Sequence, residues 1–424
     1  MKIAVIGTGI AGNVAAYYLA KEHDITVFEA NDYIGGHTHT HNIEMDGQQH
    51  QIDTGFIVFN YWTYPNFIKL LEELDVGVQA SDMSFSVKCE STGLEYNGTS
   101  LNSLFAQRRN FLRPSFYRMI KDILRFNREA PLLLDQDESD MSLGDYLQQQ
   151  KYSPHFINNY IIPMGSAIWS ADPVTLIKIP AKFFIRFFHN HGMLNVSDRP
   201  VWHVIKGGSR QYVTKLTQGF KDRIRLNQPV RYIRRLPTHV EIKTDNDELQ
   251  CFDAVFIASH SDQALKMLDD ATVLEREVLG AITYQRNEVI LHTDTRLLPK
   301  KKLAWAAWNY HLLPKNTGLA ALTYNMNILQ GLDSRETFCV TLNHTAAIDE
   351  TKIIKRMEYD HPVFTPESVL AQQRQGEING INRTYFCGAY WRNGFHEDGV
   401  VSALNALQHF KEREYAQLHI RRAG

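Results

Sequence analysis

The sequence predicts an α/β protein with a Rossmann-like lobe that binds a dinucleotide, and residues 1–36 carry most of this prediction. An apolar run at 3–6 (IAVI) leads into residues 7–12 (GTGIAG), then a helical stretch and a second strand at 25–28. This is a βαβ unit with G-x-G-x-x-G on its first turn and an acid, Glu29, after its second strand. At 424 residues the chain is too long for one compact core, so we expect two or three lobes.

Each residue type in this unit has a physical role. Gly7 permits the tight turn, Gly9 lets the backbone approach a pyrophosphate, and Gly12 lets the helix pack closely on the strand. The helix start at Ile10 and Ala11 presents N–H groups and a partial positive charge to the phosphates. Glu29 is expected to hold the ribose hydroxyls, and the next residue is Ala30 rather than an arginine, which disfavours a 2′-phosphorylated cofactor.

A second glycine pair, Gly35-Gly36, follows the acid and is itself followed by His37 and Thr38. A nicotinamide cofactor does not need this pair. A longer, extended cofactor does, because the pair lets the backbone return to the pyrophosphate. The run 7–36 resembles the FAD-binding start of the amine oxidase and phytoene desaturase superfamily.

The resemblance continues through the chain. Residues 52–60, with Gly55 and Phe56, are similar to the segment that passes beside the flavin ring in that superfamily. Residues 202–210 resemble its glycine-pair return to the nucleotide lobe, and the strand around Val230 resembles the one whose backbone meets the adenine. The closing FAD motif is matched by two runs: 386–390, which includes Gly388, and 394–400, which ends in Asp398, Gly399 and Val400.

A narrower resemblance is to flavoproteins related to the N-terminal segment of plant cyclopropane fatty acid synthases, whose bacterial members are linked with acyl-chain modification. It implies FAD, held without a covalent bond because no cysteine lies at an attachment position. Two positions depart from the wider pattern. Ala389 stands where an acid is usual, and His37 stands where amine oxidases often have an arginine.

The resemblance implies a discontinuous FAD-binding lobe and an α+β substrate-binding lobe, as in amine oxidases. We expect the FAD-binding lobe to comprise 1–80, 200–265 and 370–424, and the substrate-binding lobe to comprise 81–199 and 266–369. Strands are expected at 240–243, 254–258, 288–292 and 338–342, where apolar and polar residues alternate or an apolar run occurs. The last helix is expected at 402–413, with its N-terminus near Asp398 stabilising negative charge on the reduced flavin.

His396, in the closing motif, is the preferred acid or base, and a structural hydrogen bond to a helix end is the alternative. His37, His39 and His41 alternate along the chain, which is a spacing that metal sites can use. No acid converges with them, however, so no metal is predicted there.

Two segments are both basic and aromatic, 105–128 and 178–188. A basic face with aromatic anchors suits an anionic bilayer surface, and the alternative is an amphipathic element whose rings are simply core. The expected location is cytoplasmic, and these two segments add the hypothesis of peripheral contact at the inner membrane surface. A signal peptide is the rival interpretation of the N-terminus, but its glycine spacing argues against one.

Three functions remain open: oxidation, such as desaturation, of a lipid acyl chain or other apolar small molecule; oxidation of an amine to an imine with hydrogen peroxide; and service as a flavin-binding partner of an acyl-chain methyltransferase. The net charge of −2 gives no reason to expect nucleic acid. Hydrolase and kinase motifs are absent from the sequence, and no apolar run is long enough to span a bilayer. The four cysteines are widely spaced and are expected to be buried free thiols.

Overall fold

A computed structural model describes residues 1–136, 141–245, 248–314 and 318–423. Its first sheet is five-stranded and parallel, in the order β10-β2-β1-β14-β20. The strands are β1 (Lys2–Ile6), β2 (Asp24–Phe28), β10 (Ile224–Arg225), β14 (Ala254–Ile257) and β20 (Thr384–Phe386). Helix α1 (Ile10–Leu19) connects β1 to β2 and is buried over most of its length. The predicted Rossmann-like α/β lobe is confirmed.

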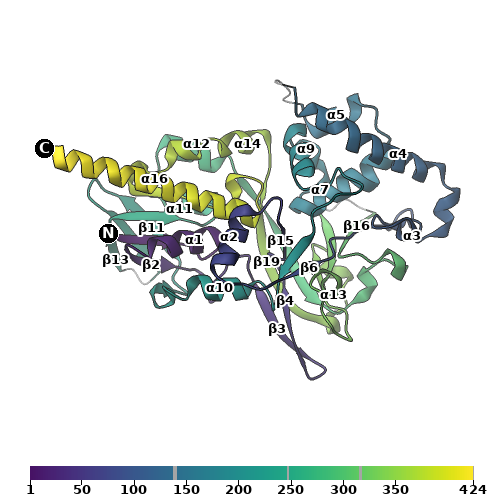
Figure 1. Ribbon diagram of the computed structural model, residues 1–424, viewed down its shortest axis with the longest axis horizontal. Coiled ribbons are helices and arrows are strands. Elements are labelled where there is room, and N and C mark those ends of the chain that lie inside the picture. Colours follow the sequence, from purple (N-terminus) through teal and green to yellow (C-terminus); the bar gives the residue numbers. More distant parts are fainter. Residues whose placement is uncertain (137–140, 246–247, 315–317, 424) are drawn as a thin grey trace.

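This sheet is assembled from three distant parts of the chain. β1 and β2 come from the N-terminus, β10 and β14 from the middle, and β20 from near the C-terminus. A three-stranded antiparallel sheet of β11 (Val230–Arg235), β12 (Val240–Thr244) and β13 (Leu249–Phe252) lies between β10 and β14 in sequence. The last helix, α16 (His396–Ala423), packs against α1 and closes one face of the lobe (Figure 1). The discontinuous assembly follows the sequence prediction, whereas the domain boundaries stay a prediction.

The second lobe is α+β. Its seven-stranded mixed sheet has the order β19-β15-β18-β17-β16-β7-β8. The strands are β7 (Phe85–Cys89), β8 (Glu95–Asn97), β15 (Thr283–His292), β16 (Trp308–Leu312), β17 (Ala321–Asn325), β18 (Cys339–Leu342) and β19 (Ile353–Val363). Helices at the far end from the FAD lobe include α4 (Pro114–Glu129), α5 (Leu143–Gln149), α7 (Ile162–Trp169) and α9 (Ala181–Asn190) (Figure 1).

The long pair β15 and β19 forms the central part of the molecule, between the helices of the two lobes (Figure 1). A small sheet of β5 (Val58–Asn60), β9 (Trp202–Ile205) and β6 (Val78–Ser81) and the hairpin of β3 (Thr40–Met45) and β4 (Gln48–Asp53) complete the sheets. The four predicted strands are confirmed as β12, β14, β15 and β18, although the predicted range 254–258 ends one residue beyond β14 and 338–342 begins one residue before β18.

Two expectations need correction. The last helix begins at His396 rather than Ser402, because Asp398 reaches back and its carboxylate accepts the backbone N–H of Phe395 at 2.9 Å, which caps the first turn. Gly399 is therefore inside the helix rather than at its entry. Of the four free cysteines, Cys251 is exposed, because it faces outward on a strand of the antiparallel sheet. No helix in the described parts of the chain combines the length and the apolar character needed to cross a bilayer.

Candidate functional site

The turn after β1 has the geometry that a bound pyrophosphate needs. Gly7 has φ +97°, which disfavours other residues. A Cβ on Gly12 would lie 2.0 Å from the carbonyl oxygen of Gly7, so only glycine allows this contact between turn and helix. A Cβ on Gly9 would meet no described atom within 4 Å, so the backbone there faces open space. Ile10 and Ala11 begin α1 directly behind this space.

Glu29 is buried at the end of β2, and its carboxylate is tied to the same turn. One oxygen accepts the backbone N–H of Thr8 at 2.8 Å and the Thr8 hydroxyl at 2.5 Å, and the other accepts the N–H of Asn31 at 2.9 Å. Glu29 therefore holds the glycine turn in place. Its predicted contact with the ribose hydroxyls would add to this role.

The second glycine pair lies against the first turn. A Cβ on Gly36, which has φ +57°, would lie 3.0 Å from the Cα of Gly9. One on Gly55 would lie 2.1 Å from the carbonyl oxygen of His37. The three segments predicted to line the cofactor from the N-terminal 80 residues therefore meet through backbone contacts that side chains would prevent.

The closing motif comes to the same place from the C-terminal end. A Cβ on Gly399 would lie 2.5 Å from the Ile10 side chain, so the first turn of α16 packs on the first turn of α1. Gly388 donates its N–H to the Ser402 hydroxyl at 2.8 Å, which fixes the loop after β20 to α16. Val400 is buried beside α1. Two helix N-termini therefore converge on one region, where their unpaired N–H groups favour anions.

Three histidines from distant segments, His37, His260 and His361, lie close together beside the second glycine pair. The His37 ring lies 6.0 Å from that of His260, 5.5 Å from that of His361 and 5.0 Å from the ring of Tyr359. Burial, together with His361 and His260, holds the pKa of His37 well below its usual value. Burial and His260 lower the pKa of His361 to about 4. These imidazoles are therefore neutral at pH 7.

Sequence reasoning missed His260 and His361, which no motif or spacing singles out. His260 lies three residues after β14, directly before helix α11 (Ser261–Met267), and His361 lies in β19, so the two are 101 positions apart. His361 is oriented by Asn287 of β15, whose side-chain amide lies 3.2 Å from the His361 Nδ1. Of the alternating histidines, only His37 joins the cluster: the His39 ring stacks on Tyr33 and contacts His41, both at 4.0 Å.

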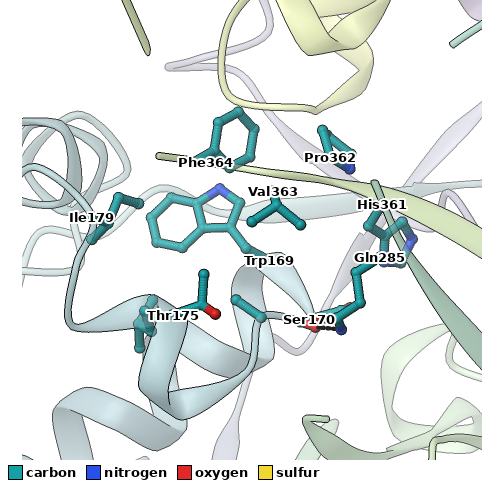
Figure 2. Close-up of a pocket in the computed structure, with 11 residues that line it drawn as sticks. Trp169, Ser170, Thr175, Ile179, Gln285, His361, Pro362, Val363 and Phe364 are labelled. Carbon is teal, nitrogen blue, oxygen red and sulfur yellow. Dashed lines mark hydrogen bonds between the residues drawn. The ribbon is translucent and has the colours of Figure 1, made fainter. Parts of the chain in front are cut away.

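A small, largely apolar pocket with a cavity volume of about 20 Å³ lies beside His361. Residues between 169 and 179 form one wall, and residues of β15 and β19 form the other. Figure 2 shows the Trp169 indole between Phe364 and Thr175, with His361 and Gln285 at the opposite end. The Trp169 indole N–H donates to the carbonyl oxygen of Asn393 at 3.3 Å, so the pocket wall is fastened to the segment that precedes α16. The pocket therefore lies within the second lobe, beside the segment that precedes α16.

His396 lies in a different environment from these histidines. Its ring stacks on Phe56 at 3.4 Å, and its Nε2 is 2.8 Å from the Tyr212 hydroxyl and 3.0 Å from the Thr38 hydroxyl. Burial holds its pKa well below the usual value. This geometry favours the alternative of a structural hydrogen bond, and acid–base catalysis by His396 stays a prediction.

Comparisons with known proteins give the same assignment as the glycine geometry. Residues 10–408 match the family of flavin-containing amine oxidoreductases. The chain belongs to this family. It is 32% identical over 154 residues to a 1-hydroxycarotenoid 3,4-desaturase from Flavobacterium sp. (strain P99-3), a match that covers 35% of this chain and only 26% of that protein.

Solved structures with the same fold include two of different chemistry. Cyclohexylamine oxidase from Brevibacterium oxydans IH-35A superposes with a TM-score of 0.70 at 15% identity, covering 97% of this chain and 99% of that one. A CLA-producing fatty acid isomerase from P. acnes superposes with a TM-score of 0.68 at 15% identity, covering 96% and 98%. At these identities the likeness establishes the fold.

The protein is therefore an FAD-dependent oxidoreductase of the amine oxidase family. The residues present fit this cofactor: open space at Gly9, close backbone contacts at Gly12, Gly36 and Gly55, and the close packing of Gly399, in the first turn of α16, on Ile10. Cys387 precedes the closing glycine but is fully buried, and burial raises its thiol pKa to about 12, so it is a core residue. Non-covalent attachment stays a prediction, as does the contact of Val230 with the adenine.

Glu29→Ala is expected to weaken FAD binding by about 1.5–3 kcal/mol, which is typical of a hydrogen bond to a charged group. The variant loses both the predicted ribose contact and the bonds to Thr8 and Asn31 that hold the turn. Fluorescence titration of the stripped protein with FAD measures the change. Glu22→Ala, at an exposed acid after α1, is the matched control and should bind as the wild type does.

His396→Ala tests the two roles open to that residue. The structure leads us to expect a fall in FAD content and melting temperature, because the variant empties a space between Phe56 and Tyr212 and leaves the Thr38 hydroxyl without its histidine partner. An acid–base role would instead leave FAD content intact and lower turnover by ~10²–10⁴-fold. The ratio of FAD to protein in the purified variant separates the two results.

Proposed function

We propose that the protein oxidises a fatty acyl chain, with desaturation as the reaction type. The observation that carries this proposal is the pocket beside His361, whose walls include Trp169, Val363 and Phe364. Such a lining buries methylene groups favourably, at roughly 0.8 kcal/mol each. It offers no carboxylate, among the described lining residues, to pair with a charged amine. The carotenoid desaturase and the fatty acid isomerase among the similar proteins act on apolar chains, which supports the same substrate class.

Such a reaction needs a hydride acceptor, residues that orient the acyl chain and a proton acceptor. When bound, FAD would supply the hydride acceptor, and dioxygen or another acceptor would reoxidise it. The Trp169 and Phe364 side chains would orient the acyl chain and exclude water. Forming a carbon–carbon double bond also releases one proton. His361 lines the pocket and is neutral, and we propose that it accepts this proton at Nδ1, the nitrogen with the lone pair, to which the Asn287 side-chain amide donates.

Amine oxidation is the second candidate, and the family membership favours it. Rapid anaerobic mixing of the oxidised protein with a C18 acyl phospholipid, with cyclohexylamine or with putrescine distinguishes the candidates through loss of the flavin absorbance. Bleaching by the phospholipid alone supports acyl oxidation, and bleaching by an amine alone overturns it. Bleaching by none of them, together with co-purification of an acyl-chain methyltransferase, would support the partner-subunit hypothesis.

A membrane lipid as substrate requires contact with a bilayer, and the structure partly supports the segment 105–128 for this role. Phe111, Leu112, Tyr117 and Leu124 are exposed there, and the Leu112 side chain is 88% accessible. Exposed cations surround them at Arg108, Arg109, Arg118, Lys121 and Arg128. The acid of the segment, Asp122, is buried, 3.8 Å from Arg118 and 3.7 Å from Arg125. In 178–188, by contrast, Phe184, Phe187 and Phe188 are buried and Phe183 is half-buried, so the exposed residues of that segment are the cations Lys178 and Arg186.

Replacing Arg108, Arg109 and Arg113 together by glutamate is expected to weaken binding to anionic vesicles at low salt. The expected loss is about 1 kcal/mol for each cation removed near the surface. Co-sedimentation with phosphatidylglycerol vesicles measures it, and FAD content should not change. The matched control reverses three exposed charges on the FAD lobe: Lys221, Arg223 and Arg234. Equal sedimentation of both variants would contradict the proposed surface.

A further inference from the structure

Two histidines and a glutamate converge at one edge of the seven-stranded sheet, outside the pocket. His311 lies near the end of β16, Glu90 directly follows β7, and His344 follows β18 by two residues. β16 runs parallel to β7 and is antiparallel to β17, which is antiparallel to β18, so the carboxyl ends of β7, β16 and β18 share one edge. The topology therefore brings together three side chains that are far apart in sequence.

The nitrogen and oxygen atoms of this group are close enough to act on one ion. One ligand atom from each residue lies within 4.8 Å of the other two, and the His344 Nε2 is 3.9 Å from the Glu90 Oε1. Ligands at ~2.0–2.2 Å around a tetrahedral zinc ion are roughly 3.3 Å apart. Closing the difference requires small side-chain rotations. His344 and Glu90 can make them, because their side chains are 19% and 36% exposed.

His311 is the fixed member of the group and has an unused ring nitrogen. Its side chain is almost fully buried, and its Nδ1 has no hydrogen-bond partner among the described residues. An orphaned buried nitrogen is costly and calls for a partner. The other nitrogen, Nε2, lies 2.9 Å from the Thr323 hydroxyl oxygen. That oxygen is 2.8 Å from the Thr341 hydroxyl oxygen, which in turn is 2.7 Å from the His292 Nε2.

This chain of hydroxyls orients the His311 ring from behind. Metal-binding histidines characteristically have their second nitrogen held by such a neighbour. The Thr323 hydroxyl can accept the Nε2 proton and leave Nδ1 as a free lone pair. The nearby cation, Lys88, does not occupy the position, because its ammonium is bound to the carbonyl oxygens of Arg296, Leu297 and Leu298 at 3.0, 3.4 and 3.3 Å.

We propose that Glu90, His311 and His344 form a binding site for a divalent transition-metal ion, with zinc as the best match to two imidazoles and one carboxylate. Three protein ligands leave a fourth position for a water molecule. The site ties the ends of three strands together. It is separate from the FAD lobe and independent of the reaction proposed above.

The test uses the FAD-bound protein after treatment with EDTA and dialysis, titrated with zinc chloride against a chromophoric chelator. The expected result is one zinc ion per chain, with binding weakened about tenfold or more in His344→Gln and in Glu90→Gln. Zinc should also raise the melting temperature of the wild type, and this rise should be lost in both variants. Both substitutions are at partly exposed positions, so we expect the variants to fold. The flavin absorbance spectrum of each variant checks this.

The control is the double variant His189→Gln and Glu22→Gln, which removes one exposed histidine and one exposed glutamate outside the group. It should bind zinc as tightly as the wild type does. Equal zinc affinity in His344→Gln, Glu90→Gln and wild type would overturn the proposal, since the ion would then be bound elsewhere. Failure of the wild type to retain one zinc ion would also overturn it. Neither result depends on the substrate of the flavin reaction.

Discussion

Gly12→Val is expected to yield protein without FAD. A Cβ at this position would lie 2.0 Å from the carbonyl oxygen of Gly7, and a backbone atom cannot move aside as a flexible side chain can. The helix must therefore shift away from the turn, at the ~1–3 kcal/mol cost of overpacking, and this moves the N–H groups of Ile10 and Ala11 away from the pyrophosphate. The absorbance ratio at 450 and 280 nm of the purified protein measures bound FAD.

The control for this variant is Gly219→Val. Gly219 is exposed just after helix α10 (Arg210–Thr217), and a Cβ there would meet no described atom within 4 Å. The control should be as yellow as the wild type. A Gly12→Val protein that retains full FAD would contradict the close-packing role assigned to Gly12 and the location of the cofactor beside it.

His361→Asn is expected to keep FAD and to lose flavin reduction by the substrate, by the ~10²–10⁴-fold typical of a general acid or base. Asparagine is close in size and polar, so the contact with Asn287 can persist while the proton acceptor is lost. Stopped-flow anaerobic reduction with a C18 acyl phospholipid measures the rate. His239→Asn, directly before β12 in the FAD lobe, is the matched control. A normal rate in His361→Asn would remove His361 from the proposed mechanism.

The pH dependence of this step follows from the same environment. Burial and His260 lower the pKa of His361 to about 4, so the imidazole is neutral and able to accept a proton at every pH well above that value. The reduction rate in the wild type should therefore be nearly flat from pH 6 to 8. It should fall only as the pH approaches 4, where the imidazole becomes protonated.

The glycine turn, the second strand with its acid and the closing motif were predictable because their physical requirements are local. Gly7, Gly12 and Glu29 occupy positions where backbone conformation or close contact leaves little choice of residue, and that restriction can be read from spacing. The predicted strands in β12, β14, β15 and β18 likewise followed from local hydrophobic patterning.

The start of the last helix was predicted six residues late. The motif at 394–400 was expected to be a loop because it contains Gly394 and Gly399, and glycine is a poor helix former. Two contacts override that propensity: Asp398 caps the first turn by accepting the N–H of Phe395, and Gly399 packs on Ile10 where no side chain fits. The first contact is local to the start of α16, whereas the second is visible only once α16 is placed against α1.

The sequence by itself determined the family, the dinucleotide lobe and the cofactor, because these rest on short segments whose residue types are fixed by backbone geometry. Only the tertiary structure decided which histidines matter. His37, His260 and His361 meet because β14 and β19 end near the second glycine pair, and Glu90, His311 and His344 meet because three strands of one sheet end at the same edge. Neither group of residues forms a recognisable spacing in the sequence, because long-range strand pairing rather than local propensity brings its members together.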